Sequence, residues 1–281
     1  MSQLNIGIIG LGYVGKACQS VFSNFFNVFT FDINGSGSEG SLIDLVEKVD
    51  ILFLCVPTPM NNDGSCNLDI VESILSDVNN VKNSVFVIKS TIPPGSSTNF
   101  ENKFKNLKIY FNPEFLTEAN FIEDFKNQNR IIIGSSDKNF NLIDKIYKHS
   151  FPNTKIIKCS LEEAEMVKYF INAFLSVKVS YANEFFDLCN ELNINYDTVA
   201  NIAQFDKRLG NSHFQVPGPD GKFGFGGSCL PKDINSVIDI CSKNNVKSYV
   251  LKAAWDRNIN KDRKERDWEQ LVERAVVKNN E

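Results

Sequence analysis

The sequence lacks the features that would direct it to a membrane, a nucleic acid or a metal. Its 281 residues contain no apolar run of membrane-spanning length. The net charge is −4 and no basic stretch precedes the C-terminal tail, which argues against nucleic acid as the main partner. Only two histidines are present, His149 and His213, and neither lies in a cluster of cysteine and histidine, so no metal site is expected.

Disulfides are also not expected. The seven cysteines are odd in number and no signal peptide is recognised, which fits a reducing cytoplasm rather than a disulfide framework. A chain of this length can bury one large or two modest cores, and two domains are the better expectation. The mixed-sign run at residues 261–266 predicts a solvated helix face.

What is present is an alternation of short apolar segments with helical or loop segments. The expected strands are residues 4–9, 27–31, 51–56, 85–89, 107–110, 130–134 and 155–157. This alternation predicts an α/β fold with a doubly wound, mostly parallel sheet of the Rossmann type. Ser160 followed by Glu163 has the pattern of a helix N-terminus, and a helix to about Leu192 is expected. We therefore predict a nucleotide-binding domain at residues 1–159, and a long connecting helix with a mostly helical domain at 160–281.

A glycine-rich turn directly follows the first expected strand. In Gly10-Leu11-Gly12-Tyr13-Val14-Gly15, the first glycine permits a tight turn, the second lets a pyrophosphate approach, and the third lets a helix pack. Asp32 ends the second strand about twenty residues later, where an acid can bind the adenosine ribose of NAD but would repel a 2′-phosphate. A Rossmann-like domain that binds no dinucleotide is the alternative. The candidate cofactor contacts are Gly10, Gly12, Tyr13, Val14, Gly15 and Asp32.

Polar side chains follow three further strands, at the edge where ligands of such sheets bind. Thr58 and Thr91 lie in proline-containing segments after the third and fourth strands, and Glu114 and Glu118 follow the fifth. The alternatives are ordinary proline-rich turns and solvated glutamates.

Cys229 stands where a glycine-rich loop is expected to enter a helix, in Gly224-Phe225-Gly226-Gly227-Ser228-Cys229-Leu230-Pro231-Lys232-Asp233. Pro231 suits a first helical turn, whose free N–H groups favour a thiolate. Lys232 and Asp233 add a cation and a proton acceptor, as in activated cysteines. A buried structural cysteine is the alternative.

Lys168 and Asn172 lie four residues apart in the long helix and therefore share a face. In so apolar a stretch, the two polar groups must either reach solvent or serve a polar pocket, and the sequence leaves both open.

Six ordered blocks together resemble the nucleotide-sugar dehydrogenases, the UDP-glucose/GDP-mannose dehydrogenase family. They are Gly10-Leu11-Gly12-Tyr13-Val14-Gly15, Cys55-Val56-Pro57-Thr58-Pro59, Ser90-Thr91-Ile92-Pro93-Pro94-Gly95, Asn112-Pro113-Glu114-Phe115-Leu116-Thr117-Glu118, Lys168 with Asn172, and Gly224 to Asp233. The resemblance implies oxidation of a sugar C6 alcohol to a carboxylate with two NAD per turnover, in polysaccharide biosynthesis. UDP-glucose, giving UDP-glucuronate, is the best candidate substrate, although the sequence does not separate it from GDP-mannose or an N-acetylhexosamine nucleotide.

The resemblance also implies roles for individual residues. Lys168, through a water held with Asp233, accepts the alcohol proton, and Cys229 forms a thiohemiacetal and then a thioester. Further catalytic roles fall to groups that handle the hydrolytic water or stabilise negative charge on oxygen: Glu114, Glu118, Thr91 and Asn172. The remaining implied cofactor contacts are Thr58, Thr91, Glu118 and Lys232, and the implied substrate contacts are Glu114, Phe115, Leu116, Lys168, Asn172, Arg208, Phe223, Phe225 and Gly226.

Partners are implied as well. Arg208 matches a family arginine that reaches the substrate of a neighbouring subunit, which implies a homodimer through the central helices. Typical members carry a further, UDP-binding domain after these helices, and the sequence stops near Asn280, so we expect a compact enzyme or a separate protein that supplies that domain. Two alternatives stay open: a single-step dehydrogenase of the β-hydroxyacid type, which the retained Cys229 argues against, and a non-catalytic NAD-binding or assembly protein.

Overall fold

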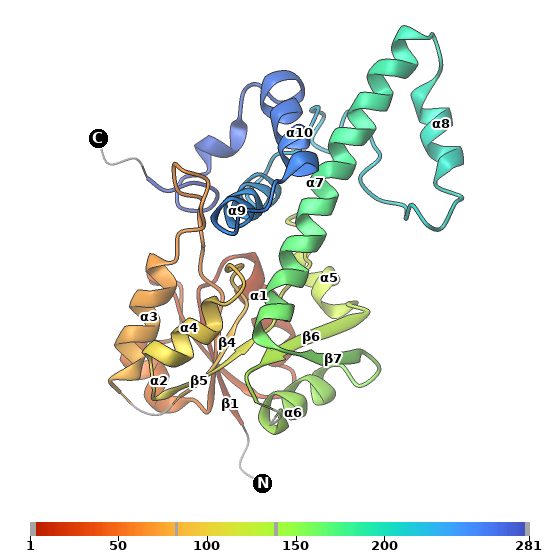
Figure 1. Cartoon of the computed structure of the whole chain (residues 1–281). Helices are drawn as coiled ribbons and strands as arrows, with labels where there is room; N and C mark the ends of the chain where they lie inside the picture. Colours follow the sequence, from red (N-terminus) through yellow and green to blue (C-terminus); the bar gives the residue numbers. More distant parts are fainter. Residues whose placement is uncertain (1–3, 82–83, 138–139, 279–281) are drawn as a thin grey trace. The chain divides into compact units, whose positions relative to one another are not determined.

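The computed structural model describes residues 4–81, 84–137 and 140–278. The chain divides into two compact units (Figure 1). Unit 1 comprises Met1–Thr58 and Leu68–Lys168, and unit 2 comprises Pro59–Asn67 and Tyr169–Glu281.

Unit 1 is built on a seven-stranded sheet with the strand order β2-β1-β3-β4-β5-β6-β7. The strands are β1 (Asn5–Ile9), β2 (Asn27–Phe31), β3 (Ile51–Leu54), β4 (Ser84–Ile88), β5 (Leu107–Phe111), β6 (Arg130–Ser135) and β7 (Lys155–Cys159). Neighbouring strands pair in parallel except β5 and β6, which are antiparallel. The predicted mostly parallel, Rossmann-type sheet is therefore confirmed.

Helices cover both faces of this sheet. They are α1 (Tyr13–Phe22), α2 (Leu42–Lys48), α3 (Asp69–Asn79), α4 (Ser96–Lys103), α5 (Phe121–Lys126) and α6 (Asn141–Ser150). One buried cluster joins α1, α5 and α6 to alternate residues of the strands, and a second joins α2, α3 and α4 to the other face. Every residue of β3 is buried because both faces are covered.

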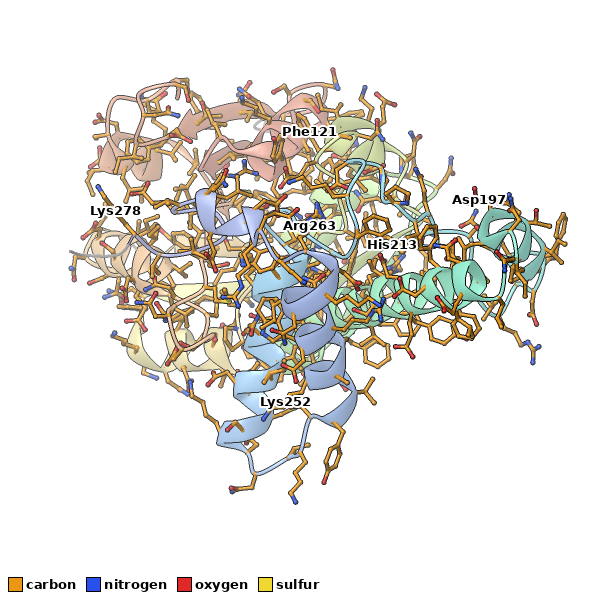
Figure 2. The ribbon with its side chains drawn as sticks, turned by 90° about the horizontal axis from the view of Figure 1, so that it is seen from above. Phe121, Asp197, His213, Lys252, Arg263 and Lys278 are labelled. Carbon is orange, nitrogen blue, oxygen red and sulfur yellow. The ribbon has the colours of Figure 1, made fainter. Side chains whose placement is uncertain are left out.

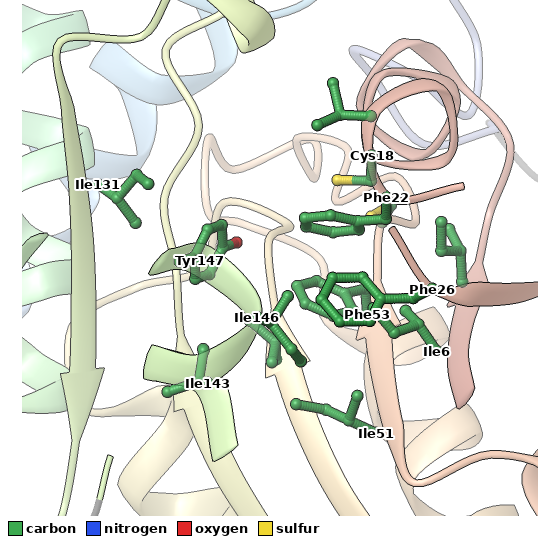
Figure 3. Packing of buried hydrophobic residues seen from close by; sticks show 14 of the residues in the cluster. Ile6, Cys18, Phe22, Phe26, Ile51, Phe53, Ile131, Ile143, Ile146 and Tyr147 are labelled. Carbon is green, nitrogen blue, oxygen red and sulfur yellow. The ribbon is translucent and has the colours of Figure 1, made fainter. Parts of the chain in front are cut away.

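Aromatic rings pack with isoleucines in the core beside α1, which Figure 3 shows from close by. The ring of Phe22 lies 5.0 Å from that of Phe53 and 5.9 Å from that of Tyr147, measured between centroids. Burial of one such side chain stabilises the fold by about 1.5–3 kcal/mol. These contacts fix α1, and with it the glycine-rich turn that precedes the helix.

The long helix α7 (Leu161–Glu191) belongs to unit 1 as far as Lys168 and to unit 2 beyond it. Its start is a capping box: the Ser160 hydroxyl accepts a hydrogen bond from the Glu163 N–H at 3.1 Å, and the Glu163 carboxylate accepts one from the Ser160 N–H at 2.8 Å. The predicted start is confirmed, and the predicted end is correct to one residue.

The rest of unit 2 is mainly helical, as predicted, with an irregular stretch between α8 and α9. The elements are α8 (Tyr196–Ala203), α9 (Leu230–Lys243), α10 (Tyr249–Arg257), the π-helix η1 (Asn258–Asp262) and the 3-10 helix η2 (Asp267–Gln270). Its cores are small, and the second of them groups Phe225 with Ile234 and Ala254.

One sequence prediction is correct only in part. Most of the mixed-sign run at residues 261–266 is exposed, but the run is helical only at residues 261–262, and Arg263, labelled in Figure 2, is only 1% exposed. Its guanidinium forms ion pairs with Asp220 and with Asp267, which compensate its burial. Asp220 lies far away in the sequence, so the charge pattern of the run itself could not reveal it.

Among the described residues, no helix is both long and apolar enough to pass through a lipid bilayer. The same residues contain no group of three or more His, Cys, Asp or Glu side chains arranged to hold a metal ion.

Candidate active site

The glycine-rich turn of unit 1 has the geometry that its sequence predicts. Gly10 has a φ of +89°, and a Cβ atom there would lie 2.6 Å from the Cys55 carbonyl oxygen. At Gly15 a Cβ atom would lie 1.9 Å from the Gly10 carbonyl oxygen, so only glycine lets α1 pack this closely. Space around Gly12 is open, and no side chain caps the helix that follows it. The first-turn N–H groups of α1 are therefore directed at a site that can take an anion.

Asp32 lies beside this turn. Its carboxylate accepts hydrogen bonds from the N–H groups of Leu11, at 2.5 Å, and Asn34, at 3.0 Å. Tyr13 is partly exposed, with its ring 5.1 Å from that of Phe121, while Val14 packs against the core. An open helix N-terminus with an acid at the end of β2 is a set of groups that fits the pyrophosphate and ribose of NAD.

The two threonines at the strand ends are joined. The Thr58 hydroxyl donates a 2.7 Å hydrogen bond to the Thr91 carbonyl oxygen, and both side chains are buried. This bond ties the segment after β3 to the segment after β4, at the edge where the glycine-rich turn also lies.

Lys168 does not extend to solvent. Its ammonium donates hydrogen bonds to the Glu114 carbonyl oxygen at 2.6 Å and to the Glu114 carboxylate at 3.0 Å. The other carboxylate oxygen accepts the Leu116 N–H at 2.7 Å, and Phe115 lies against the same ammonium, at 5.4 Å from the ring centroid. Burial alone would raise the pKa of Glu114, but Lys168 and the Leu116 N–H hold it below its ordinary value.

Structure separates the two glutamates that the sequence could not distinguish. The Glu114 side chain is 10% exposed and paired with a cation, whereas Glu118 is exposed on the following loop. Glu114 is thus held in a fixed arrangement by the Lys168 ammonium and the Leu116 N–H.

Cys229 is the N-cap residue of α9, and Pro231 lies in the first turn of that helix, as predicted. The Lys232 ammonium donates a 2.6 Å hydrogen bond to one carboxylate oxygen of Asp233, and the Asn172 amide donates one of 2.6 Å to the other. Burial would lower the pKa of Lys232, but Asp233 and the Cys229 thiol raise it well above its ordinary value. Within unit 2, a thiol, an ammonium, a carboxylate and an amide are thus grouped at one helix N-terminus.

The loop before Cys229 is held by residues that the sequence analysis missed. Asn183 accepts a 3.2 Å hydrogen bond from the Gly224 N–H, and Asn258 bonds both the N–H and the carbonyl oxygen of Phe225, at 2.8 and 2.9 Å. A Cβ atom at Gly226 would lie 2.7 Å from the Arg263 guanidinium. Asn183 had a sequence signal, because it lies eleven residues, about three turns, after Asn172 on α7. Asn258 and Arg263 had none.

The remaining candidates occupy different surroundings. Phe225 is buried with its ring 6.2 Å from that of Trp255, and Phe223 is partly exposed. Arg208 is exposed and forms an ion pair with Asp206.

A Rossmann-type unit with an NAD-compatible turn, followed in the chain by helices that carry a polar cysteine site, is the arrangement of a dinucleotide-binding protein. Sequence models of the UDP-glucose/GDP-mannose dehydrogenase family match the chain, the NAD binding domain at residues 38–151 and the central domain at residues 162–261. The chain belongs to the UDP-glucose/GDP-mannose dehydrogenase family, and the predicted NAD-binding domain is confirmed.

Individual proteins that are similar to this chain carry names from the same family. The chain is 31% identical over 255 residues to a UDP-glucose 6-dehydrogenase of Rickettsia conorii, over 88% of this chain and 54% of the relative. It is 30% identical over 294 residues to the UDP-glucose 6-dehydrogenase TuaD of Bacillus subtilis, over 90% and 62%. A solved UDP-glucose dehydrogenase from Pyrobaculum islandicum superposes with a TM-score of 0.81 at 28% identity, over 90% of this chain and 67% of that one. The chain spans about half the length of the curated relatives it matches.

Proposed function

We propose that this chain catalyses the NAD-dependent oxidation of the C6 alcohol of a nucleotide sugar, best UDP-glucose to UDP-glucuronate, through a covalent intermediate on Cys229. The observation that carries the proposal is the placement of the Cys229 thiol at the N-terminus of α9, with Lys232, Asp233 and Asn172 in one hydrogen-bonded group. The names of the relatives, UDP-glucose 6-dehydrogenases, support the choice of substrate.

In the first oxidation the C6 alcohol loses a proton and a hydride. NAD, when bound at the turn 10–15, supplies the hydride acceptor for each oxidation. The Lys168 ammonium, which Glu114 holds in place by an ion pair, donates a hydrogen bond to the alcohol oxygen as that oxygen becomes negative. The Asp233 carboxylate, oriented by Lys232 and Asn172, receives the alcohol proton through a water molecule.

In the second oxidation the Cys229 sulfur adds to the C6 aldehyde and forms a thiohemiacetal. Loss of a second hydride to NAD and of the hydroxyl proton to solvent converts this adduct into a thioester, and water then cleaves the C–S bond to release the carboxylate and restore the thiol. A carboxylate, either Glu114 or Asp233, orients this water, and Thr91 is a further candidate for that role. Glu118, exposed on its loop, is assigned to the cofactor side together with Thr58 and Lys232.

The stoichiometry of the reaction tests this proposal against both alternatives. The purified chain is incubated with NAD and UDP-glucose, then with other sugar nucleotides, and NADH is counted per substrate consumed at completion. Two NADH with a uronic acid product are expected. One NADH would instead support a single-step dehydrogenase. NAD binding without turnover would support a non-catalytic protein or a domain supplied by a separate partner chain.

The variant Cys229→Ser tests the thiol itself. Acid formation should stop, since a serine hydroxyl at this position is a far weaker nucleophile than a thiol, while the first oxidation continues slowly. Cys241→Ser, on the same helix α9, serves as the matched control and should leave acid formation unchanged. Undiminished acid formation by Cys229→Ser would remove the covalent step from the proposal.

We also propose that a second copy of the chain covers an apolar stripe on α7. The stripe consists of exposed Phe170, Phe174, Tyr181, Phe185 and Leu188. Phe174, Tyr181 and Leu188 recur every seven residues, the spacing of helices that pair along one seam. Tyr181→Asp should convert a dimer into a monomer by light scattering, and Val246→Asp, which changes an exposed apolar residue elsewhere, should not. A wild-type chain that is monomeric at micromolar concentration would refute the dimer.

A further inference from the structure

A buried carboxylate outside the candidate active site joins α7 to α4. Glu165 lies on α7, in unit 1, and its side chain has no exposed surface. One carboxylate oxygen accepts the Gly95 N–H at 2.6 Å, and the other accepts the Ser97 N–H at 2.8 Å. Both donors lie about seventy residues earlier in the chain, so this is a tertiary contact that no local pattern predicts.

The donors are those that the N-terminus of a helix leaves unpaired. α4 begins at Ser96, directly after Gly95, which is its N-cap and has a φ of +90°. Glycine has no side chain with which to cap, and the first turn of α4 contains no acidic residue. Glu165 therefore supplies from another helix the cap that α4 lacks, and its charge also interacts favourably with the helix dipole.

The segment held in this way is the one that carries Thr91. At its beginning, the Thr91 carbonyl accepts the Thr58 hydroxyl at 2.7 Å, and the Ser90 hydroxyl donates to the Val56 carbonyl at 2.7 Å. At its end, Gly95 is fixed by Glu165. Two prolines between these ends restrict the backbone further. Segment 91–95 is thus held at both ends, and loss of the Glu165 contact would free the end at Gly95.

The same face of α7 also contacts the loop after β5 that carries Glu114. Lys168 follows Glu165 by three residues, nearly one turn, and binds the Glu114 carbonyl and carboxylate. Two adjacent side chains of one helix thus fix the loops that carry Thr91 and Glu114. Burial raises the pKa of Glu165 to about 7, despite the two N–H donors. Burying this carboxylate therefore costs free energy, whereas a solvent-exposed helix cap would not incur that cost.

We propose that Glu165 is a positioning residue that holds loop 91–95 in the conformation that receives the NAD cofactor. The inference rests on the proposed function, because that function assigns Thr91 to the cofactor. Glu165 itself contacts neither cofactor nor substrate and acts through the backbone of α4.

Three variants of the full chain test the assignment. Glu165→Ala removes both acceptors, Glu165→Gln keeps the shape and one acceptor, and Glu162→Gln is the matched control. Glu162 lies one turn earlier on α7 and also contacts α4, but through the Thr98 hydroxyl at an exposed position. The dissociation constant of NADH is measured by fluorescence, together with hydrogen exchange of the Gly95 and Ser97 amides.

Glu165→Ala should raise the NADH dissociation constant about tenfold, equivalent to about 1.4 kcal/mol, and should speed exchange of both amides. Glu165→Gln should show a smaller increase of the same sign, which keeps the test decisive if the alanine variant fails to fold. In turnover, the change should appear in the KM for NAD rather than in kcat. Glu162→Gln should match the wild type.

Two outcomes overturn the inference, and they are distinguishable. Faster exchange in the Glu165 variants with an unchanged NADH dissociation constant would make Glu165 a structural cap alone and leave the proposed function intact. A wild-type chain that binds no NADH would overturn the proposed function and this inference together.

Discussion

Unit 1 and unit 2 each bury a lysine against a carboxylate, but the two pairs are built differently. Lys168 and Glu114 are separated by 54 residues and meet only when α7 packs beside the loop after β5. Lys232 and Asp233 are adjacent in sequence at the start of α9, and a residue of α7, Asn172, completes the pair. The Lys168–Glu114 pair therefore forms only with the tertiary fold, whereas the Lys232–Asp233 pair involves adjacent residues in the first turn of α9.

The pairs also differ in what remains when the acid is lost. Lys168 would keep a hydrogen bond to the backbone carbonyl of Glu114, at 2.6 Å. For Lys232, Asp233 is the sole hydrogen-bond acceptor identified among the described residues. A buried cation without a partner is costly, so loss of the acid should destabilise the fold more at the Lys232–Asp233 pair than at the Lys168–Glu114 pair.

The largest effect is expected for Asp233→Asn. It removes the proton acceptor and leaves Lys232 buried beside an amide, so we expect a loss of turnover of about 10²–10⁴-fold. The free energy of unfolding should fall by about 3–5 kcal/mol. Steady-state kinetics and urea unfolding measure the two effects. Asp239→Asn, which removes a half-buried acid of the same helix that pairs with the exposed Lys243, is the control. Equal loss in both variants would show that α9 tolerates no change of charge, rather than that Asp233 is special.

A smaller loss of stability is expected for Glu114→Gln. The Lys168 ammonium keeps its bond to the main chain, so the free energy of unfolding should fall by about 1–3 kcal/mol. Glu123→Gln, which breaks the exposed pair with Lys126, should cost less than about 1 kcal/mol. Should Glu114→Gln prove more destabilising than Asp233→Asn, the order of sensitivity stated above is wrong.

An effect of comparable size is a pH dependence in which two buried acids of unit 1 act with opposite sign. Glu114 has a lowered pKa, so its stabilisation is present above its ordinary value of 4.5 and is lost as pH falls through the folded value. Glu165 has a pKa raised to about 7 by burial and by its charged neighbour Glu162, so its contribution is present below 4.5 and is lost as pH rises through about 7.

Urea unfolding between pH 4.5 and 7.5 separates the two acids. The wild type should lose up to about 3 kcal/mol relative to Glu165→Gln over this range, since the glutamine does not titrate. Glu114→Gln should keep the wild-type decline. If the difference in the free energy of unfolding between wild type and Glu165→Gln did not change with pH, the Gly95 and Ser97 N–H groups would fully offset the cost of burying the charge.

Local features of the fold were predictable from sequence. The strands, the capping box at Ser160 and the helix start at Cys229 each follow from residues that lie within a few positions of one another. The position of Gly15 follows as well, because the close approach it permits is to the carbonyl oxygen of Gly10, five residues earlier.

Features that depend on distant partners were not predictable. Sequence alone left Lys168 between solvent and a pocket, since Glu114 is brought to it only by the packing of α7. It missed Glu165 and Arg263 because their partners, Gly95 and Asp220, carry no signal of the contact. It also could not rank Glu114 above Glu118, because the distinction is one of burial.

The segment Pro59–Asn67 has a consequence for the synthesis of the chain. It lies between two strands of unit 1 but belongs to unit 2, where the Met60 N–H bonds the Ala275 carbonyl at 2.8 Å and the Met60 carbonyl accepts the Val277 N–H at 3.0 Å. A ribosome delivers residue 60 long before residue 275, so these backbone groups leave the exit tunnel with water as their only partner. The backbone partners of Met60 in unit 2 are therefore formed only after residues 275–277 have been synthesised.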